Sequence, residues 1–106
     1  MRGLMLVLLI LFTTASNACA QGGLAENGRS LVVRMCAQCH AIDAAEDSQV
    51  PSAPAFRRLE PRVDLEELQK RLQDGILAGH PEMPVFILKA NEAHAVVAYL
   101  KSIRAD

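Results

Sequence analysis

The chain has 106 residues, which is enough for one small domain. Its 11 basic and 12 acidic residues leave a net charge of −1, and the absence of any basic run or aromatic-rich basic patch argues against a nucleic-acid-binding surface. With no tryptophan, one tyrosine and three phenylalanines, the chain can build only a modest hydrophobic core of its own.

The N-terminus predicts an export signal. A short basic start precedes an unbroken apolar run, and residues 18–20 form the Ala-x-Ala pattern of a cleavage site. We expect a signal peptide over residues 1–20, cleaved after Ala20, followed by one periplasmic domain over 21–106 without stable membrane insertion. An uncleaved anchor and lipid-modified Cys19 are the alternatives, but the apolar run is about half of the roughly 20 residues that span a bilayer.

A first helix is predicted over residues 24–35, where apolar side chains recur at helical spacing. Gly28 lies inside this stretch. Because glycine costs about 1 kcal/mol relative to alanine in a helix interior, we expect a close packing contact there.

The first helix leads into Cys36-Ala37-Gln38-Cys39-His40, and this C-x-x-C-H spacing is that of a c-type haem attachment site. Two thiols on one helical turn can bond to both vinyl groups of a porphyrin, and the adjoining histidine can bind its iron. The alternatives are a zinc site, which needs a second ligand pair, a dithiol redox motif, which usually follows a strand, and a structural disulfide. The motif therefore predicts one covalent haem c and its iron, with His40 as a ligand.

Two further helices are predicted downstream. Asp64 begins an amphipathic stretch that ends near Gly79, and a glutamate three residues after Asp64 gives the pattern of a capping box. Asn91 can cap a last helix that runs through about Arg104. The proline-containing segments between the helices are expected to be irregular: residues 41–62 and 80–90. This order of elements predicts an all-α domain wrapped around a cofactor.

The second axial position of the iron has four candidate ligands: Met35, His80, Met83 and His94. Met35 directly precedes the attachment motif and cannot easily reach the opposite haem face, and His94 falls off the apolar stripe of the last helix. Met83 lies in a loop that prolines stiffen on both sides, which suits a thioether held against iron. His80, in the same loop, is the alternative ligand.

Together these motifs resemble the small class I cytochromes c of bacteria, over nearly all of residues 24–104. Besides the C-x-x-C-H site, three segments carry the resemblance: Pro54-Ala55-Phe56, Gly79-His80-Pro81-Glu82-Met83-Pro84-Val85-Phe86 and Val96-Val97-Ala98-Tyr99-Leu100-Lys101. The resemblance implies a cytochrome c-like fold, in which three main helices and their loops enclose one haem attached through Cys36 and Cys39.

The resemblance also implies roles for single residues. His40 and Met83 would be the axial ligands, and the Pro54 carbonyl would accept a hydrogen bond from the His40 ring and orient it. Phe56 would lean on the haem from the same side. At the crossing of the first and last helices, the implied contacts are those of Gly28 and Val32 with Val96 and Tyr99.

The chain also departs from the family pattern. It has no tryptophan to bind a haem propionate, as mitochondrial-type relatives have, so the candidates for that role, otherwise surface arginines, are Arg57, Arg58 and Arg62. The usual ring of lysines around the haem edge is reduced to Lys70, Lys89 and Lys101.

These features predict a monomeric electron carrier rather than an enzyme, with iron cycling between Fe(II) and Fe(III) and both axial ligands retained. Its expected partners are a periplasmic dehydrogenase, a membrane cytochrome complex or a terminal oxidase, met in brief encounters over a small interface. The alternatives are a haem sensor or weak peroxidase in which Met83 is displaced, and a cytochrome subunit bound permanently to one dehydrogenase.

Overall fold

A computed structural model of the chain describes residues 16–75 and 82–105. The regular elements in these ranges are all helical: α2 (Ser16–Met35), the 3₁₀ helix η1 (Phe56–Arg58), α3 (Leu65–Asp74) and α4 (Ala90–Ile103). The predicted all-α fold with three main helices is confirmed. Over the same ranges, none of the helices combines the length and apolar character that crossing a bilayer requires.

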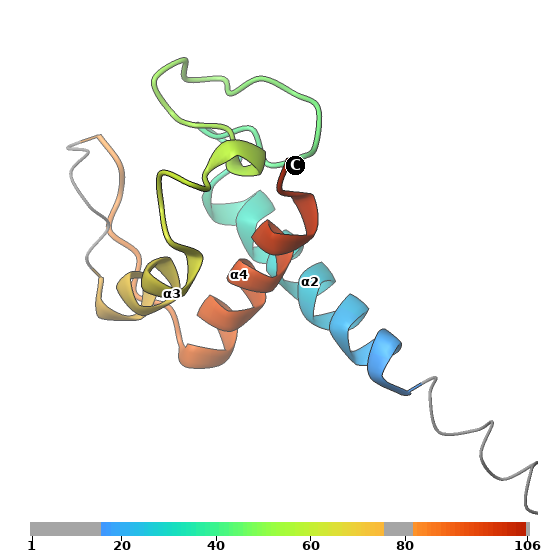
Figure 1. Ribbon diagram of the computed structural model, residues 1–106. Coiled ribbons are helices and arrows are strands. Elements are labelled where there is room, and N and C mark those ends of the chain that lie inside the picture. The colour runs from blue at the N-terminus through green and yellow to red at the C-terminus, as the bar shows by residue number, and fades with distance from the viewer. Residues whose placement is uncertain (1–15, 76–81, 106) are drawn as a thin grey trace, which may run out of the picture.

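Helices α2 and α4 cross at Gly28 (Figure 1). A Cβ atom built on Gly28 would lie 1.9 Å from the carbonyl oxygen of Ala95 and 3.0 Å from the Cβ atom of Tyr99. No side chain fits at such a distance from a backbone carbonyl, so only glycine lets the two helices approach this closely. The expected packing contact at Gly28 is confirmed, with Ala95 rather than Val96 as its nearest neighbour.

Helix α2 is longer than predicted, because it begins at Ser16 rather than Leu24. Its backbone therefore continues across the expected cleavage position after Ala20. Farther along, Val32 is fully buried in the core that α2 shares with the other helices.

The start of α3 follows the sequence prediction in part. The Asp64 carboxylate accepts hydrogen bonds from the backbone N–H groups of Glu66 and Glu67, at 2.8 and 3.0 Å, and so caps the helix. The Glu67 side chain forms an ion pair with Arg71 one turn later. The cap is therefore made by Asp64 without the reciprocal bond of a capping box.

Helix α3 ends at Asp74, earlier than the predicted end near Gly79. Gly75 follows with a φ of 78°, a left-handed conformation that glycine adopts without steric cost. Its N–H bonds to the carbonyl of Arg71 and closes the last turn. Gly79 itself, with residues 76–81, lies outside the described part of the chain.

The N-terminal cap of α4 differs from the prediction. The helix begins at Ala90, and the Glu92 carboxylate reaches back to accept a hydrogen bond from the Lys89 N–H at 3.0 Å. Asn91 lies inside the first turn, so its prediction as the cap is wrong. The predicted apolar stripe is confirmed, because its buried members face the core: Ala93, Val96, Val97 and Leu100.

The segment between α2 and α3 forms the wide loop at the top of Figure 1 and contains η1, which the sequence did not predict. Arg57 within η1 is buried, so its interpretation as a solvated surface arginine is wrong. Its guanidinium donates to the Glu46 carbonyl and lies 3.8 Å from the Asp47 carboxylate. The Arg57 carbonyl accepts a bond from the Ala105 N–H, which ties this loop to the chain after α4.

Candidate functional site

The C-terminal end of α2 presents the two cysteines. The Cys36 N–H still bonds to the Val32 carbonyl at 2.8 Å, and the His40 N–H bonds to the Cys36 carbonyl at 3.0 Å, so the motif forms one continuous turn. Cys36 is half-buried, Cys39 is exposed, and both are free thiols. Burial raises the pKa of the Cys36 thiol to about 11. A thioether at this position would be uncharged as well, so conversion of the thiol to a thioether would place no charge on this half-buried sulfur.

The His40 ring is oriented by the backbone of a distant segment. Its Nδ1 atom lies 2.8 Å from the carbonyl oxygen of Pro54, the hydrogen bond that the family resemblance implied. Because a carbonyl can only accept, this bond requires the proton to be on Nδ1. In the neutral imidazole, Nε2 then carries the lone pair and is the nitrogen that can bind a metal.

Phe56 packs against the same imidazole. The ring centroids of His40 and Phe56 are 4.6 Å apart, with the planes tilted by 33°. Phe56 is buried, and its N–H bonds to the carbonyl of Ala41, the residue after His40, at 3.0 Å. The structure therefore brings together three of the predicted site residues, His40, Pro54 and Phe56, and holds the imidazole by one hydrogen bond and one face contact.

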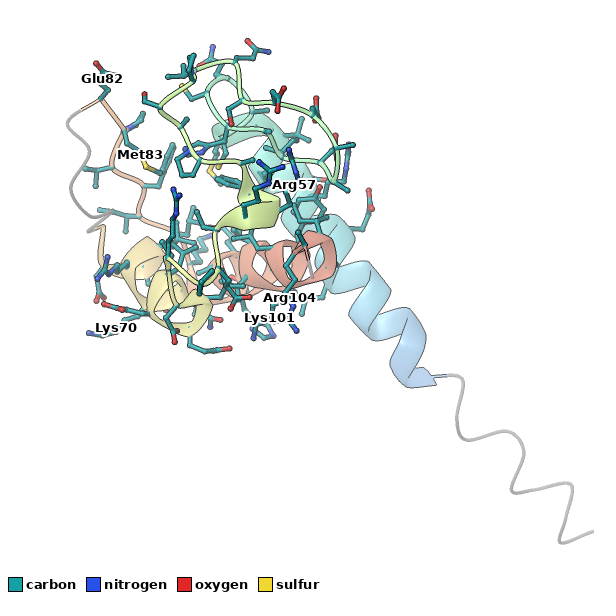
Figure 2. The ribbon with its side chains drawn as sticks, turned by 45° about the horizontal axis from the view of Figure 1, so that its top comes forward. Arg57, Lys70, Glu82, Met83, Lys101 and Arg104 are labelled. Carbon is teal, nitrogen blue, oxygen red and sulfur yellow. The ribbon has the colours of Figure 1, made fainter. Side chains whose placement is uncertain are left out.

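Met83 lies on the separate loop that precedes α4. It is half-buried, and Figure 2 shows it on the side of the loop that faces the rest of the domain, whereas Glu82 points outward. The Leu88 N–H bonds to the Leu72 carbonyl at 2.8 Å and ties the end of this loop to α3. Among the other candidate ligands, His94 is exposed on α4, and His80 lies outside the described residues.

One interaction at this site was not predicted from the sequence. The Tyr99 hydroxyl lies 2.6 Å from the Ile42 carbonyl and 3.1 Å from a carboxylate oxygen of Asp43, which is also 3.4 Å from the Arg29 guanidinium. Burial and the neighbouring Asp43 raise the pKa of Tyr99, so its hydroxyl keeps the proton that it donates. The available signal was a tyrosine on a buried helix face, which normally requires a hydrogen-bond partner.

An arginine-lined hollow of about 490 Å³ lies beside Pro54. Its polar lining comprises one buried and two exposed guanidinium groups, one hydroxyl and one carboxylate: Arg57, Arg58, Arg62, Ser48 and Asp47. The Asp47 carboxylate lies 3.8 Å from Arg57, which leaves Arg58 and Arg62 for a ligand. Guanidinium groups pair with carboxylates in bidentate geometry, so this hollow suits carboxylate groups.

Residues 23–100 match the family described as cytochrome c oxidase, cbb3-type, subunit III. The chain belongs to this family of c-type cytochromes. It is also 32% identical over 104 residues to cytochrome c-552 of Bradyrhizobium diazoefficiens, covering 98% of this chain and 95% of that relative. No solved structure matches the chain significantly. The cytochrome is therefore a haem-containing electron-transfer protein, as predicted.

The described side chains fit a haem c. The site offers two free thiols, an imidazole whose Nε2 lone pair is free to bind a metal, and a buried phenyl ring beside it. The buried phenyl ring suits a large apolar porphyrin, and the arginine-lined hollow provides guanidinium groups near Pro54 for its carboxylates.

Proposed function

We propose that the cytochrome is a periplasmic electron carrier with one haem c attached through Cys36 and Cys39 and ligated by His40 and Met83. The hydrogen bond between His40 Nδ1 and the Pro54 carbonyl carries this proposal, because it leaves Nε2 as the metal-binding nitrogen. When bound, the haem supplies one-electron chemistry through the ferrous and ferric states of its iron.

The protein residues would set the properties of the site in distinct ways. Pro54 would hold the His40 ring in one tautomer and raise its basicity. The thioether of Met83 is a soft, uncharged ligand, which favours the ferrous state and a fairly high reduction potential. Phe56 would exclude water on the His40 side. The exposed guanidinium groups of Arg58 and Arg62 would neutralise propionates without the tryptophan found in mitochondrial-type relatives.

The compartment and partners follow from the N-terminal signal. Residues 1–20 would direct the chain to the periplasm and be removed there. A periplasmic dehydrogenase, a membrane cytochrome complex or a terminal oxidase would then exchange electrons with it through short-lived contacts. With few lysines around the expected haem edge, these contacts would depend on ionic strength only weakly.

Visible spectra of the protein matured with covalent haem ligation provide the test. Haem that survives denaturing extraction, a low-spin spectrum and the far-red sulfur-to-ferric-iron band are the expected results. Met83→His should abolish that band and lower the reduction potential, whereas the matched variant Met35→Leu should keep both. A high-spin spectrum, or spontaneous binding of carbon monoxide by the reduced wild-type protein, would replace this proposal with the sensor or peroxidase function.

A second candidate is a cytochrome subunit held permanently by one enzyme, because the matching family is described by an oxidase subunit. Purification from its native membrane and soluble fractions separates the two functions. A free monomer in the soluble fraction supports the carrier, and stoichiometric co-purification with an oxidase or dehydrogenase supports the subunit.

A further inference from the structure

The backbone directly after His40 is held on both sides of Ala41. The Ala41 N–H donates to the Ser48 hydroxyl oxygen at 2.9 Å, and its carbonyl accepts from the Phe56 N–H at 3.0 Å. Ser48 and Phe56 belong to the same loop segment as Ala41 itself. These bonds therefore connect His40 to the loop but not to the crossed helices.

The His40 N–H bonds to the Cys36 carbonyl and so joins His40 to the end of α2. Tyr99 connects the segment that follows His40 to α4. Its hydroxyl, on α4, bonds to the Ile42 carbonyl at 2.6 Å across 57 positions of sequence. The same hydroxyl lies 3.1 Å from Asp43, which pairs with Arg29 of α2 at 3.4 Å. Residues 42 and 43 are thus bound by both helices. The Tyr99 side chain starts at the helix crossing, where its Cβ atom would be 3.0 Å from a side chain on Gly28.

We propose that Tyr99 is a positioning residue for His40, acting through the Ile42 carbonyl. The Pro54 carbonyl fixes the rotation of the imidazole, and Tyr99 holds the backbone two residues after His40. Two constraints are needed because a ring held only at Nδ1 can still tilt with its backbone. This inference rests on the proposed function in one respect, namely that His40 binds the iron.

The surroundings of residues 41–43 explain why the bond from Tyr99 is needed. Residues 44–47 are exposed, so the loop alone is a compliant support for a metal ligand. At the crossing of α2 and α4 the two backbones approach too closely for a side chain on Gly28, and Tyr99 is only 5% exposed there. Loss of its hydroxyl would leave the Ile42 carbonyl without this partner and let residues 41–43 move relative to the helices.

The test compares Tyr99→Phe with Val97→Ala in the covalent holoprotein. Val97 is buried in the same helix, so its truncation destabilises α4 without touching the Ile42 bond. Tyr99→Phe should shift the hyperfine-shifted proton resonances of the iron-bound imidazole and change the reduction potential. It should also speed hydrogen exchange at the Phe56 amide by about tenfold, as loss of one buried hydrogen bond predicts. Val97→Ala should leave the imidazole resonances at their wild-type positions.

Asp43→Asn separates the two contacts of the hydroxyl. This variant keeps an oxygen acceptor and the Ile42 bond but loses the charge that Arg29 pairs with, so the imidazole resonances should stay near their wild-type positions. Equal resonance shifts in Tyr99→Phe and Val97→Ala, no shift in Tyr99→Phe, or a full effect in Asp43→Asn would each overturn the positioning role. Failure of the proposed function would instead be seen in the wild-type protein, as the absence of any iron-bound histidine.

Discussion

Replacement of Gly28 by alanine should destabilise the protein, although alanine is more favourable than glycine within a helix. Alanine improves helix propensity by up to about 1 kcal/mol. The added Cβ, however, would lie 1.9 Å from the Ala95 carbonyl oxygen and 2.5 Å from its carbon, so α4 must move by more than 1 Å to restore ordinary contact. The obstacle is backbone rather than a flexible side-chain end, so it cannot be relieved by a rotamer change.

The size of the effect follows from the two opposing terms. Overpacking costs about 1–3 kcal/mol and occasionally more, and a gap of 0.5–1 Å elsewhere along the crossing forfeits a quarter to a half of the dispersion energy there. We therefore expect a net loss of about 2–3 kcal/mol in the free energy of unfolding of Gly28→Ala, after the gain in propensity. Urea unfolding of the holoprotein followed by circular dichroism measures it.

Gly23→Ala is the matched control, because Gly23 lies in the same helix and no neighbouring atom would come within 4 Å of its new Cβ. This variant should be neutral or more stable by up to about 1 kcal/mol. The two alanines therefore have opposite predicted signs. If Gly28→Ala stabilised the protein as much as Gly23→Ala, the close crossing of α2 and α4 would be refuted.

Three further predictions concern the caps and charges. Asp64→Ala should lower thermal stability by about 0.5–2 kcal/mol, because two N–H groups of α3 lose their acceptor, and Asp64→Asn should recover most of the loss. Arg57→Gln should cost about 1.5–3 kcal/mol in urea unfolding because a buried charge-assisted bond is lost, whereas Arg58→Gln on the exposed surface should change stability by less than about 0.5 kcal/mol. A side-chain hydrogen bond with Glu46, then those of Tyr99 and Arg29, lower the pKa of Asp43. Its stabilisation is therefore complete above its ordinary value of about 3.9 and disappears as the pH falls through the lowered pKa, so the stability difference between wild type and Asp43→Asn should shrink below about pH 4.

Much of this molecule is readable from local sequence. The C-x-x-C-H motif specifies a cofactor chemistry through five adjacent residues, and it needs only a helical turn to bring the thiols together. The helical spacing of apolar residues before and after it predicted the all-α class. Gly28 predicted a close contact, because glycine destabilises a helix interior and a packing interaction is needed to offset that loss. Met83 as second axial ligand stays a prediction.

Helix boundaries were less predictable, because the sequence offers several end signals and the structure uses only one of them. Gly75 and Gly79 are both possible caps for α3, and the chain turns at Gly75. Asn91 was an acceptable cap for α4, but Glu92 satisfies the free N–H of Lys89 from inside the helix. Each choice depends on which backbone group needs a partner after the helices pack: a carbonyl at the end of α3 and an N–H at the start of α4.

The contacts around His40 were decided by tertiary structure. Pro54 was predicted through family resemblance, since nothing in the 14 positions that separate it from His40 specifies a hydrogen bond. The bond from Tyr99 to Ile42 spans 57 positions, and the burial of Arg57 requires a loop to fold over it. Local sequence determines backbone preference, side-chain period and ligand chemistry, because these act over one or two turns. Contacts between distant segments form only when the helices cross, and that crossing decides which polar groups are buried together.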